Sequence, residues 1–188
     1  MTPVNRRFLM GAGLALPFAA PALAAFPDQP VRIIVPWNAG GLADLSIRVL
    51  APAMGSALGQ PVVVENRGGA NGALGTQAVA RAAPDGHTLV LANAETHAIN
   101  PLIYPRLPYD PQRDFTPVTI FAGAPFVLIR RPGLEADTLA ALIARARAAP
   151  GSVSYASWGI GSTAHLAMEM LARQAGITLL HVPFTGSA

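Results

Sequence analysis

The feature that most constrains the fold is a β-branched run that passes through two glycines into a helical pattern. The segment "VRIIVPW" at 31–37 has apolar residues on both faces, which is typical of a strand buried in a parallel sheet. Leucines and valines then recur at helical spacing from Leu42, and Gly59 is a natural residue to end that helix. Such a strand–turn–helix unit predicts a layered α/β fold.

The same unit repeats along the next segment. Residues 61–66 predict a second strand, 72–83 a second helix and 87–93 a third strand. This order indicates a parallel sheet with helices on both faces. Pro52 lies inside the first helix, where it removes one backbone hydrogen bond and costs about 3 kcal/mol unless the helix kinks or breaks.

A change of pattern near residue 122 predicts a crossing between two lobes, 25–122 and 123–188. The stretch 117–133 holds two short strand candidates, and Asp137 is placed to cap a following helix. Residues 153–157, about 162–175 and 178–184 repeat the strand–helix–strand order. Because the sequence stops soon afterwards, we expect the second sheet to be incomplete.

The first 24 residues predict a cleavable signal peptide. Arg6 and Arg7 precede a long uncharged stretch, and Ala22 and Ala24 supply the small residues that a signal peptidase needs. An uncleaved membrane anchor is the alternative, which Pro17 and the Ala-rich end disfavour. We therefore expect an exported, periplasmic protein.

Composition excludes several classes of function. Of 188 residues, 52% are hydrophobic and 12% charged, which is enough apolar surface for a packed core. Without the leader, the chain has eleven Arg, ten acidic residues and no Lys, a net charge near zero. We therefore expect no basic surface that would bind nucleic acid. No Cys is present, which excludes disulfides and thiol chemistry.

Three loops that follow predicted strands are candidates for binding an anion. The carboxyl ends of parallel strands are the usual ligand side of such sheets, and the first turn of a helix exposes unpaired N–H groups. Gly40 and Gly41 let a ligand approach the backbone, although a tight turn alone would also explain them. The loop 157–165 has the same design, with Ser162 and Thr163 placed to cap a helix or to contact a ligand.

The third loop follows the strand at 87–93 and presents Asn93, Thr96 and His97 to the same rim. His97 fits a structural role better than an anion contact. Asp44 is expected to anchor its loop more than to touch a ligand, and Trp37 and Trp158 to lie at the pocket edge. The motifs predict no enzyme, metal or cofactor, since no GxSxG elbow and no metal-ligand spacing of His is present.

The blocks "PVRIIVPWNAGGLAD", "LGQPVVVENRGGANGALGTQAVARAAPDGHTLVLAN", "THAINP", "LPYDPQRDFTPV" and "GSVSYASWGIGSTAHLAMEM…HVPFTGSA" resemble the substrate-binding proteins of tripartite tricarboxylate transporters, the Bug family. The resemblance covers about residue 27 to the end. It implies a periplasmic receptor with two α/β lobes of the type II binding-protein fold, monomeric at full length. Such a receptor holds a small mono-, di- or tricarboxylate in the cleft and delivers it to inner-membrane permease subunits.

The resemblance places ligand-binding residues in four segments: Trp37, Asn38, Ala39, Gly40, Gly41 and Asp44; Asn93, Thr96 and His97; Ser157, Gly159, Gly161, Ser162, Thr163 and His165; and Phe184, Thr185, Gly186 and Ser187. Phe184 and Thr185 stand where the family commonly has Tyr and Lys, so a hydroxyl and a cation are missing. The chain is also much shorter than family members, and we expect residues 25–188 alone to be marginally stable or prone to aggregate.

Three other functions remain open at this point. An extracytoplasmic sensor would use the same fold and pass its bound state to a partner receptor. An exported hydrolase would need a nucleophile such as Ser162. A non-functional fragment would also explain the short chain.

Overall fold

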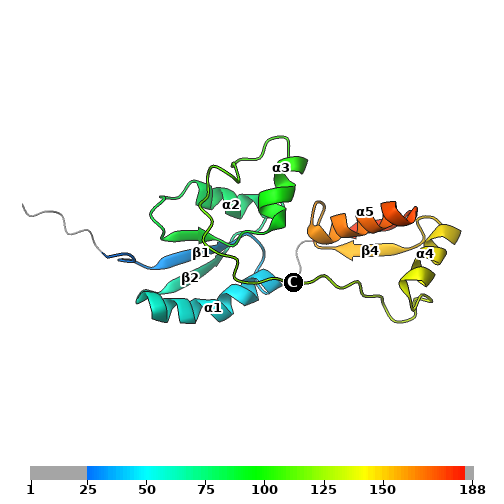
Figure 1. Cartoon of the computed structure of the whole chain (residues 1–188), viewed down its shortest axis with the longest axis horizontal. Coiled ribbons are helices and arrows are strands. Elements are labelled where there is room, and N and C mark those ends of the chain that lie inside the picture. Colours follow the sequence, from blue (N-terminus) through cyan, green and yellow to red (C-terminus); the bar gives the residue numbers. More distant parts are fainter. Residues whose placement is uncertain (1–24, 185–188) are drawn as a thin grey trace, which may run out of the picture.

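The computed structural model describes residues 25–184, which form two α/β units placed side by side (Figure 1). The predicted signal peptide at 1–24 and the candidate residues Thr185, Gly186 and Ser187 lie outside the described residues. We call the unit built on the first sheet the first lobe and the unit built on the second sheet the second lobe. No helix within 25–184 has the length and apolar character needed to cross a membrane.

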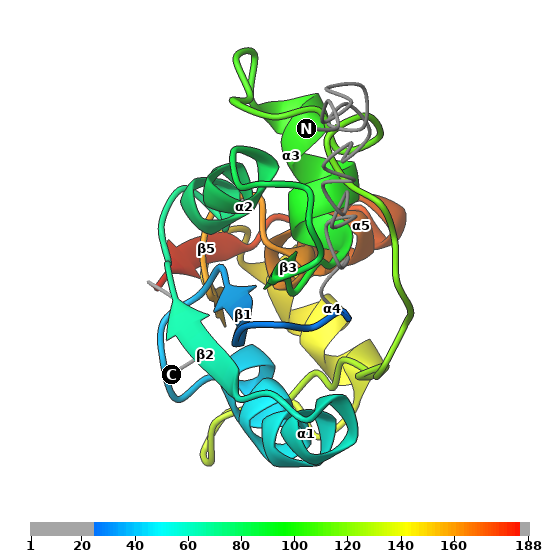
Figure 2. The same cartoon turned by 90° about the vertical axis from the view of Figure 1, so that its left-hand side faces the viewer.

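The first sheet is parallel and has the strand order β2-β1-β3. Its strands are β1 (Val31–Val35), β2 (Val62–Asn66) and β3 (Thr88–Val90). Helix α1 (Leu42–Leu58) lies on one face and α2 (Ala73–Ala80) on the other (Figure 2). The predicted β-α-β-α-β order with helices on both faces is therefore confirmed.

The core of the first lobe lies between the sheet and α1. It consists of Ile33, Val35, Ile47 and Leu91, all less than a tenth exposed. Burial of these side chains supplies the main favourable free energy of the lobe, since each contributes about 1.5–3 kcal/mol on leaving water. Trp37 packs against the same cluster, so it belongs partly to the core as well as to the loop.

Helix α1 continues through Pro52 as one helix. Of the two outcomes considered for this proline, a kink or a break, the break therefore does not occur. The hydroxyl of Ser56 donates to the carbonyl of Pro52 at 3.1 Å, one turn further along. As predicted, Gly59 ends the helix in the left-handed conformation, with φ of 68°.

After β3 the chain forms a π-helix, η1 (Glu95–Ile99), that continues into the short α3 (Asn100–Ile103). The predicted strand at 87–93 is therefore shorter than expected. Residues 91–93, Asn93 among them, lie between β3 and η1 and are not part of the strand. A π-helix is uncommon and frequently marks a functional segment.

The second lobe contains α4 (Leu139–Ala148), β4 (Ser154–Ser157), α5 (Thr163–Ala175) and β5 (Leu180–Pro183). β4 and β5 pair in parallel as a two-stranded sheet, which agrees with the predicted incomplete second sheet. Apolar side chains of β5 are partly uncovered: Leu180 is 56% and Val182 38% exposed.

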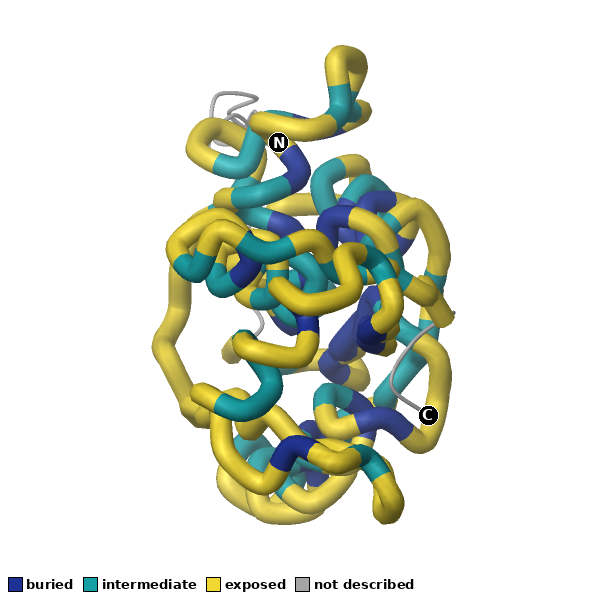
Figure 3. Tube along the Cα trace, turned by 90° about the vertical axis from the view of Figure 1, so that its right-hand side faces the viewer, coloured by how far each residue is buried: buried dark blue, intermediate teal, exposed yellow. Residues whose placement is uncertain are grey.

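Two expectations for residues 117–138 are wrong. The predicted strands in 117–133 are absent from the described structure, and every residue from 116 to 133 is exposed (Figure 3). A strand needs a hydrogen-bonded neighbour, which this connecting segment lacks. Asp137 does not cap α4, because Thr138 accepts the amide of Ala141 at 3.1 Å while Asp137 pairs with Arg130.

Candidate functional site

The glycine loop between β1 and α1 is fixed by the carboxylate of Asp44. The amide of Gly40 donates to Asp44 Oδ2 at 2.9 Å, and Oδ1 accepts from Arg48 Nε and Asn66 Nδ2, also at 2.9 Å each. Asp44 is 2% exposed, and the Asn66 amide also reaches the carbonyl of Trp37 at 3.2 Å. The chain therefore closes this turn on one of its own carboxylates.

The electrostatics of Asp44 match this anchoring role. The hydrogen bond from Arg48 is the main cause that lowers the pKa of Asp44 from 3.8 to about 2, and the Gly40 amide adds to it. The carboxylate therefore stays ionised at the start of α1, where the helix dipole favours a negative charge. Asp44 was included among ligand contacts by family position; its contacts assign it to the loop instead.

Asn38, Ala39 and Gly40 are exposed on this loop, whereas Gly41 is buried. Gly41 precedes α1 in an extended conformation. Because it has no side chain, it offers no side-chain oxygen to accept a hydrogen bond from the first-turn N–H groups of α1. Asn38 lies against the β2–α2 loop, since a Cβ built on Gly68 would come within 2.5 Å of Asn38 Oδ1. Asn38 is thus an exposed polar side chain at this end of the first sheet, as are Arg67 and Asn93.

The loop after β3 uses its polar groups internally. Asn93 Oδ1 accepts the amide of Thr96 at 3.1 Å, and the Thr96 hydroxyl accepts from the Asn93 amide at 3.2 Å. Thr96 is fully buried and its hydroxyl is engaged within the loop, so its contact with a ligand stays a prediction. Burial satisfied by local hydrogen bonds makes it a structural residue.

His97 packs among aromatic rings, with its centroid 4.9 Å from that of Phe115 and 6.3 Å from that of Tyr109. Its Nδ1 lies 2.9 Å from the Thr96 hydroxyl. Burial lowers the pKa of His97 below its usual value, which favours the neutral ring. These surroundings correspond to the structural role that the sequence favoured for His97.

The loop between β4 and α5 is closed in a similar way. Ser162 caps α5 by accepting the amide of His165 at 3.2 Å and is fully buried, which makes it unsuitable as a nucleophile. The amide of Gly161 donates to His165 Nδ1 at 3.2 Å. Of the two hydroxyl residues predicted at this helix start, Ser162 therefore caps the helix.

Ser157 and His181 also contact each other in the second lobe. Ser157 Oγ lies 2.7 Å from His181 Nε2, but Ser157 is 5% exposed and both accepts from and donates to the backbone of Gly159. The His181 ring stacks on His165 with centroids 4.1 Å apart. This serine–histidine pair is enclosed and holds the loop, so it offers little support for a hydrolase.

The two lobes meet through a carboxylate that sequence reasoning did not select. Glu95 Oε1 accepts from the indole Nε1 of Trp158 at 2.8 Å. It also accepts from Thr163, at 2.8 Å from the amide and 2.9 Å from the hydroxyl. The start of α5 therefore holds a carboxylate oxygen with three donors, and that oxygen belongs to the first lobe.

A second set of contacts between the lobes involves asparagines. Asn71 donates through Nδ2 to the Asn100 side chain at 2.9 Å and to the carbonyl of Gly161 at 3.2 Å. Asn100 is fully buried and returns a hydrogen bond to the Asn71 carbonyl at 2.9 Å. Of these residues, Gly161 was predicted from the sequence as a ligand contact, whereas Asn71 and Asn100 were present only within the blocks that carry the family resemblance.

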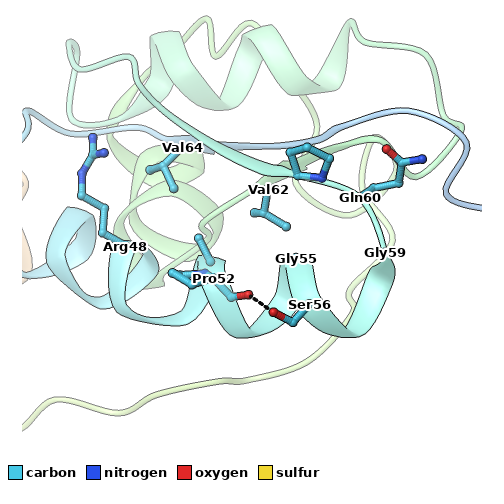
Figure 4. A pocket seen from close by; sticks show the side chains of 10 residues that line it. Arg48, Pro52, Gly55, Ser56, Gly59, Gln60, Val62 and Val64 are labelled. Carbon is cyan, nitrogen blue, oxygen red and sulfur yellow. Dashed lines mark hydrogen bonds between the residues drawn. The ribbon is translucent and has the colours of Figure 1, made fainter.

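Two pockets in the described part of the chain lie away from the predicted loops. One, of about 660 Å³, lies between α1 and β2 and is lined by Arg48, Pro52, Gly55, Val62 and Val64 among others (Figure 4). The other, of about 520 Å³, is an apolar hollow between α1 and Phe121. Neither is lined by Gly40, Gly41 or Ser162, which lie on the loops that the sequence predicts to bind an anion.

The remaining candidate, Phe184, is 60% exposed, and its amide donates to the carbonyl of Ser157 at 2.9 Å. It extends the β4–β5 pairing by one residue towards the loop of Trp158. Within residues 25–184 no group of three or more His, Asp or Glu side chains is placed to hold a metal ion.

Comparison with known proteins agrees with the fold and the motifs. A family model described as the tripartite tricarboxylate transporter family receptor matches residues 46–188. Protein BugT of Bordetella pertussis is 40% identical over 181 residues, which cover 96% of this chain and 55% of BugT. The chain thus spans about half the length of the curated relatives that it matches.

Solved structures give the same result. An R. palustris protein solved with adipate is 34% identical with a TM-score of 0.81, over 86% of this chain and 54% of that one. MatC from Rhodopseudomonas palustris with bound malate is 34% identical with a TM-score of 0.77, over 86% and 55%. The parallel sheets, the order of the motifs and these similarities lead to one conclusion: the chain belongs to the tripartite tricarboxylate transporter receptor family.

Proposed function

We propose that this chain is the ligand-binding part of an exported periplasmic receptor that binds a small carboxylate between its lobes. The ligand would be delivered to the membrane permease subunits of a tripartite tricarboxylate-type transporter. Family membership supports the class of function, and the bound adipate and malate of the two related structures support a dicarboxylate as the ligand.

The observation that carries the proposal is the donor set at the start of α5. Trp158 Nε1, the Thr163 amide and the Thr163 hydroxyl all point at one carboxylate oxygen, at 2.8–2.9 Å. Such distances are typical of strong hydrogen bonds to a charged acceptor. This part of the chain therefore has the chemistry needed to bind a carboxylate without any cationic side chain.

The first lobe would supply the other end of the site. Asn38 is exposed on the loop that leads into α1, and its side-chain amide can donate a hydrogen bond to a carboxylate. A dicarboxylate that spans the lobes would place one carboxylate near Asn38 and the other at Thr163. Both ends lie where strands lead into helices, as in other open parallel sheets.

Titration calorimetry of the purified chain against acetate, malate, adipate and citrate tests the proposal. We expect heat from at least one of the di- or tricarboxylates. The N38A variant, which loses the exposed side-chain amide proposed to bind the other carboxylate, should bind that ligand about tenfold more weakly. S154A, at an exposed serine of β4, is the matched control and should bind normally. No heat from any of the four compounds would reject the proposal.

A further inference from the structure

Glu95 is a buried acidic residue that pairs with no cation. It is 1% exposed, and none of the ion pairs formed within residues 25–184 involves it. A buried carboxylate is costly unless hydrogen bonds replace its water. Here Trp158 and Thr163 supply three of them, and Asn93 Nδ2 approaches Oε2 at 3.4 Å.

The three donors to Glu95 Oε1 come from the other lobe. Trp158 and Thr163 are 63 and 68 residues further along the chain. Glu95 itself lies at the start of η1, which follows the third strand of the first sheet. Its carboxylate therefore joins the lobes directly, by the kind of contact that a ligand carboxylate would otherwise make.

We propose that Glu95 is an internal competitor of the ligand: its carboxylate occupies the α5 end of the site, and a free carboxylate binds there only when Glu95 has left. This inference rests on the proposed function and adds a specificity-determining residue to it. A group tethered in the same chain has a high effective concentration at its partner. A monocarboxylate therefore competes poorly, whereas a dicarboxylate gains a second contact in the first lobe.

The two tryptophans provide a direct test. Their indole N–H groups give two separate signals in a ¹H–¹⁵N NMR spectrum, and a W37F variant assigns them. In the wild-type chain we expect the Trp158 signal to lie downfield because of its bond to Glu95, and acetate to leave it unchanged. In E95A the signal should move upfield, and acetate should return it in a saturable manner, with an affinity at least about tenfold higher than for the wild type.

Two further variants keep the test decisive. E95Q retains an acceptor and nearly the same volume, and it replaces E95A in the test if E95A fails to fold. Compared with the wild type, E95Q should show a small upfield shift of the Trp158 signal and a weak response to acetate. E135A removes an exposed glutamate of the second lobe and should behave as the wild type. The proposal is overturned if the Trp158 signal is the same with and without Glu95, or if acetate moves it equally in wild type and variants. These outcomes differ from failure of the proposed function, which is an absence of calorimetric binding to the wild-type chain.

Discussion

The side-chain amide of Asn71 donates to the carbonyl of Gly161 at 3.2 Å, although 90 residues separate the two along the chain. The same amide group also bonds Asn100 Oδ1 at 2.9 Å. Asn71 has a left-handed backbone, with φ of 52°, which aims its side chain across the gap between the lobes. The contact therefore depends on an unusual backbone conformation as well as on the amide.

Removal of this amide should destabilise the protein. N71G keeps the left-handed backbone accessible but leaves the buried Asn100 Oδ1 without its donor, so we expect a loss of about 1–3 kcal/mol in the free energy of unfolding. Ala70 is also left-handed, with φ of 47°, and its side chain makes no hydrogen bond. A70G is the matched control and should be neutral or slightly stabilising in the same urea denaturation. Equal effects of the two variants would contradict the role of the Asn71 amide.

The order of the elements could be predicted because hydrophobic periodicity is local. β1, β2 and the helices that follow them are each defined by residues within one segment, and Gly59 ends α1 as expected. The strands expected at 117–133 failed because a strand also needs a partner, which no local pattern reveals. Asp137 and Thr138 are both good caps, and only the geometry selects Thr138.

The site was predicted less completely for the same reason. The loops of Gly40 and Ser162 were located, yet their polar groups serve Asp44 and His165. Glu95 was not predicted as a site residue because a single glutamate in a loop forms no recognisable sequence motif. Its role depends on Thr163, which is distant in sequence and meets it only in the folded chain.

The Asp44 network predicts acid sensitivity of the first lobe. Because hydrogen bonding to Arg48 lowers the pKa of Asp44 to about 2, the folded state gains stability above the unfolded value of 3.8. That gain, about 1–2 kcal/mol after allowance for the exposed Arg48, should disappear as the pH falls from about 4 to 2. D44N should lower the free energy of unfolding at pH 7 and abolish this part of the pH dependence. An unchanged profile in D44N would show that another carboxylate dominates.

Close packing of α2 on the end of β1 predicts that Gly75 tolerates no side chain. A Cβ at this position would lie 2.6 Å from the carbonyl oxygen of Arg67 and 2.8 Å from Pro36 Cα, and backbone atoms cannot move aside cheaply. G75A should therefore destabilise by about 1–3 kcal/mol, despite the better helix propensity of Ala. G123A, where a Cβ meets nothing within 4 Å, is the control and should be neutral by thermal unfolding. A G75A chain as stable as the wild type would refute this packing.

Two histidines should make the protein less stable in mild acid. Burial lowers the pKa of His97, and burial together with His165 lowers that of His181, although Glu169 opposes the shift for His181. The unfolded chain therefore takes up protons near the ordinary value of 6.5 that the folded chain does not bind. Since stability rises with pH wherever the unfolded state binds more protons, the free energy of unfolding should fall as the pH drops through that value.

NMR titration of the histidine Cε1–H signals checks this expectation directly. His97 and His181 should titrate at lower pH in the folded chain than in urea. H97F removes one titrating ring but keeps an aromatic side chain against Phe115, whose centroid lies 4.9 Å from that of His97. Its urea midpoint should therefore change less between pH 7.5 and 5 than that of the wild type. Folded-state pKa values at or above the unfolded ones would contradict this account, because stability would then be retained or gained in mild acid.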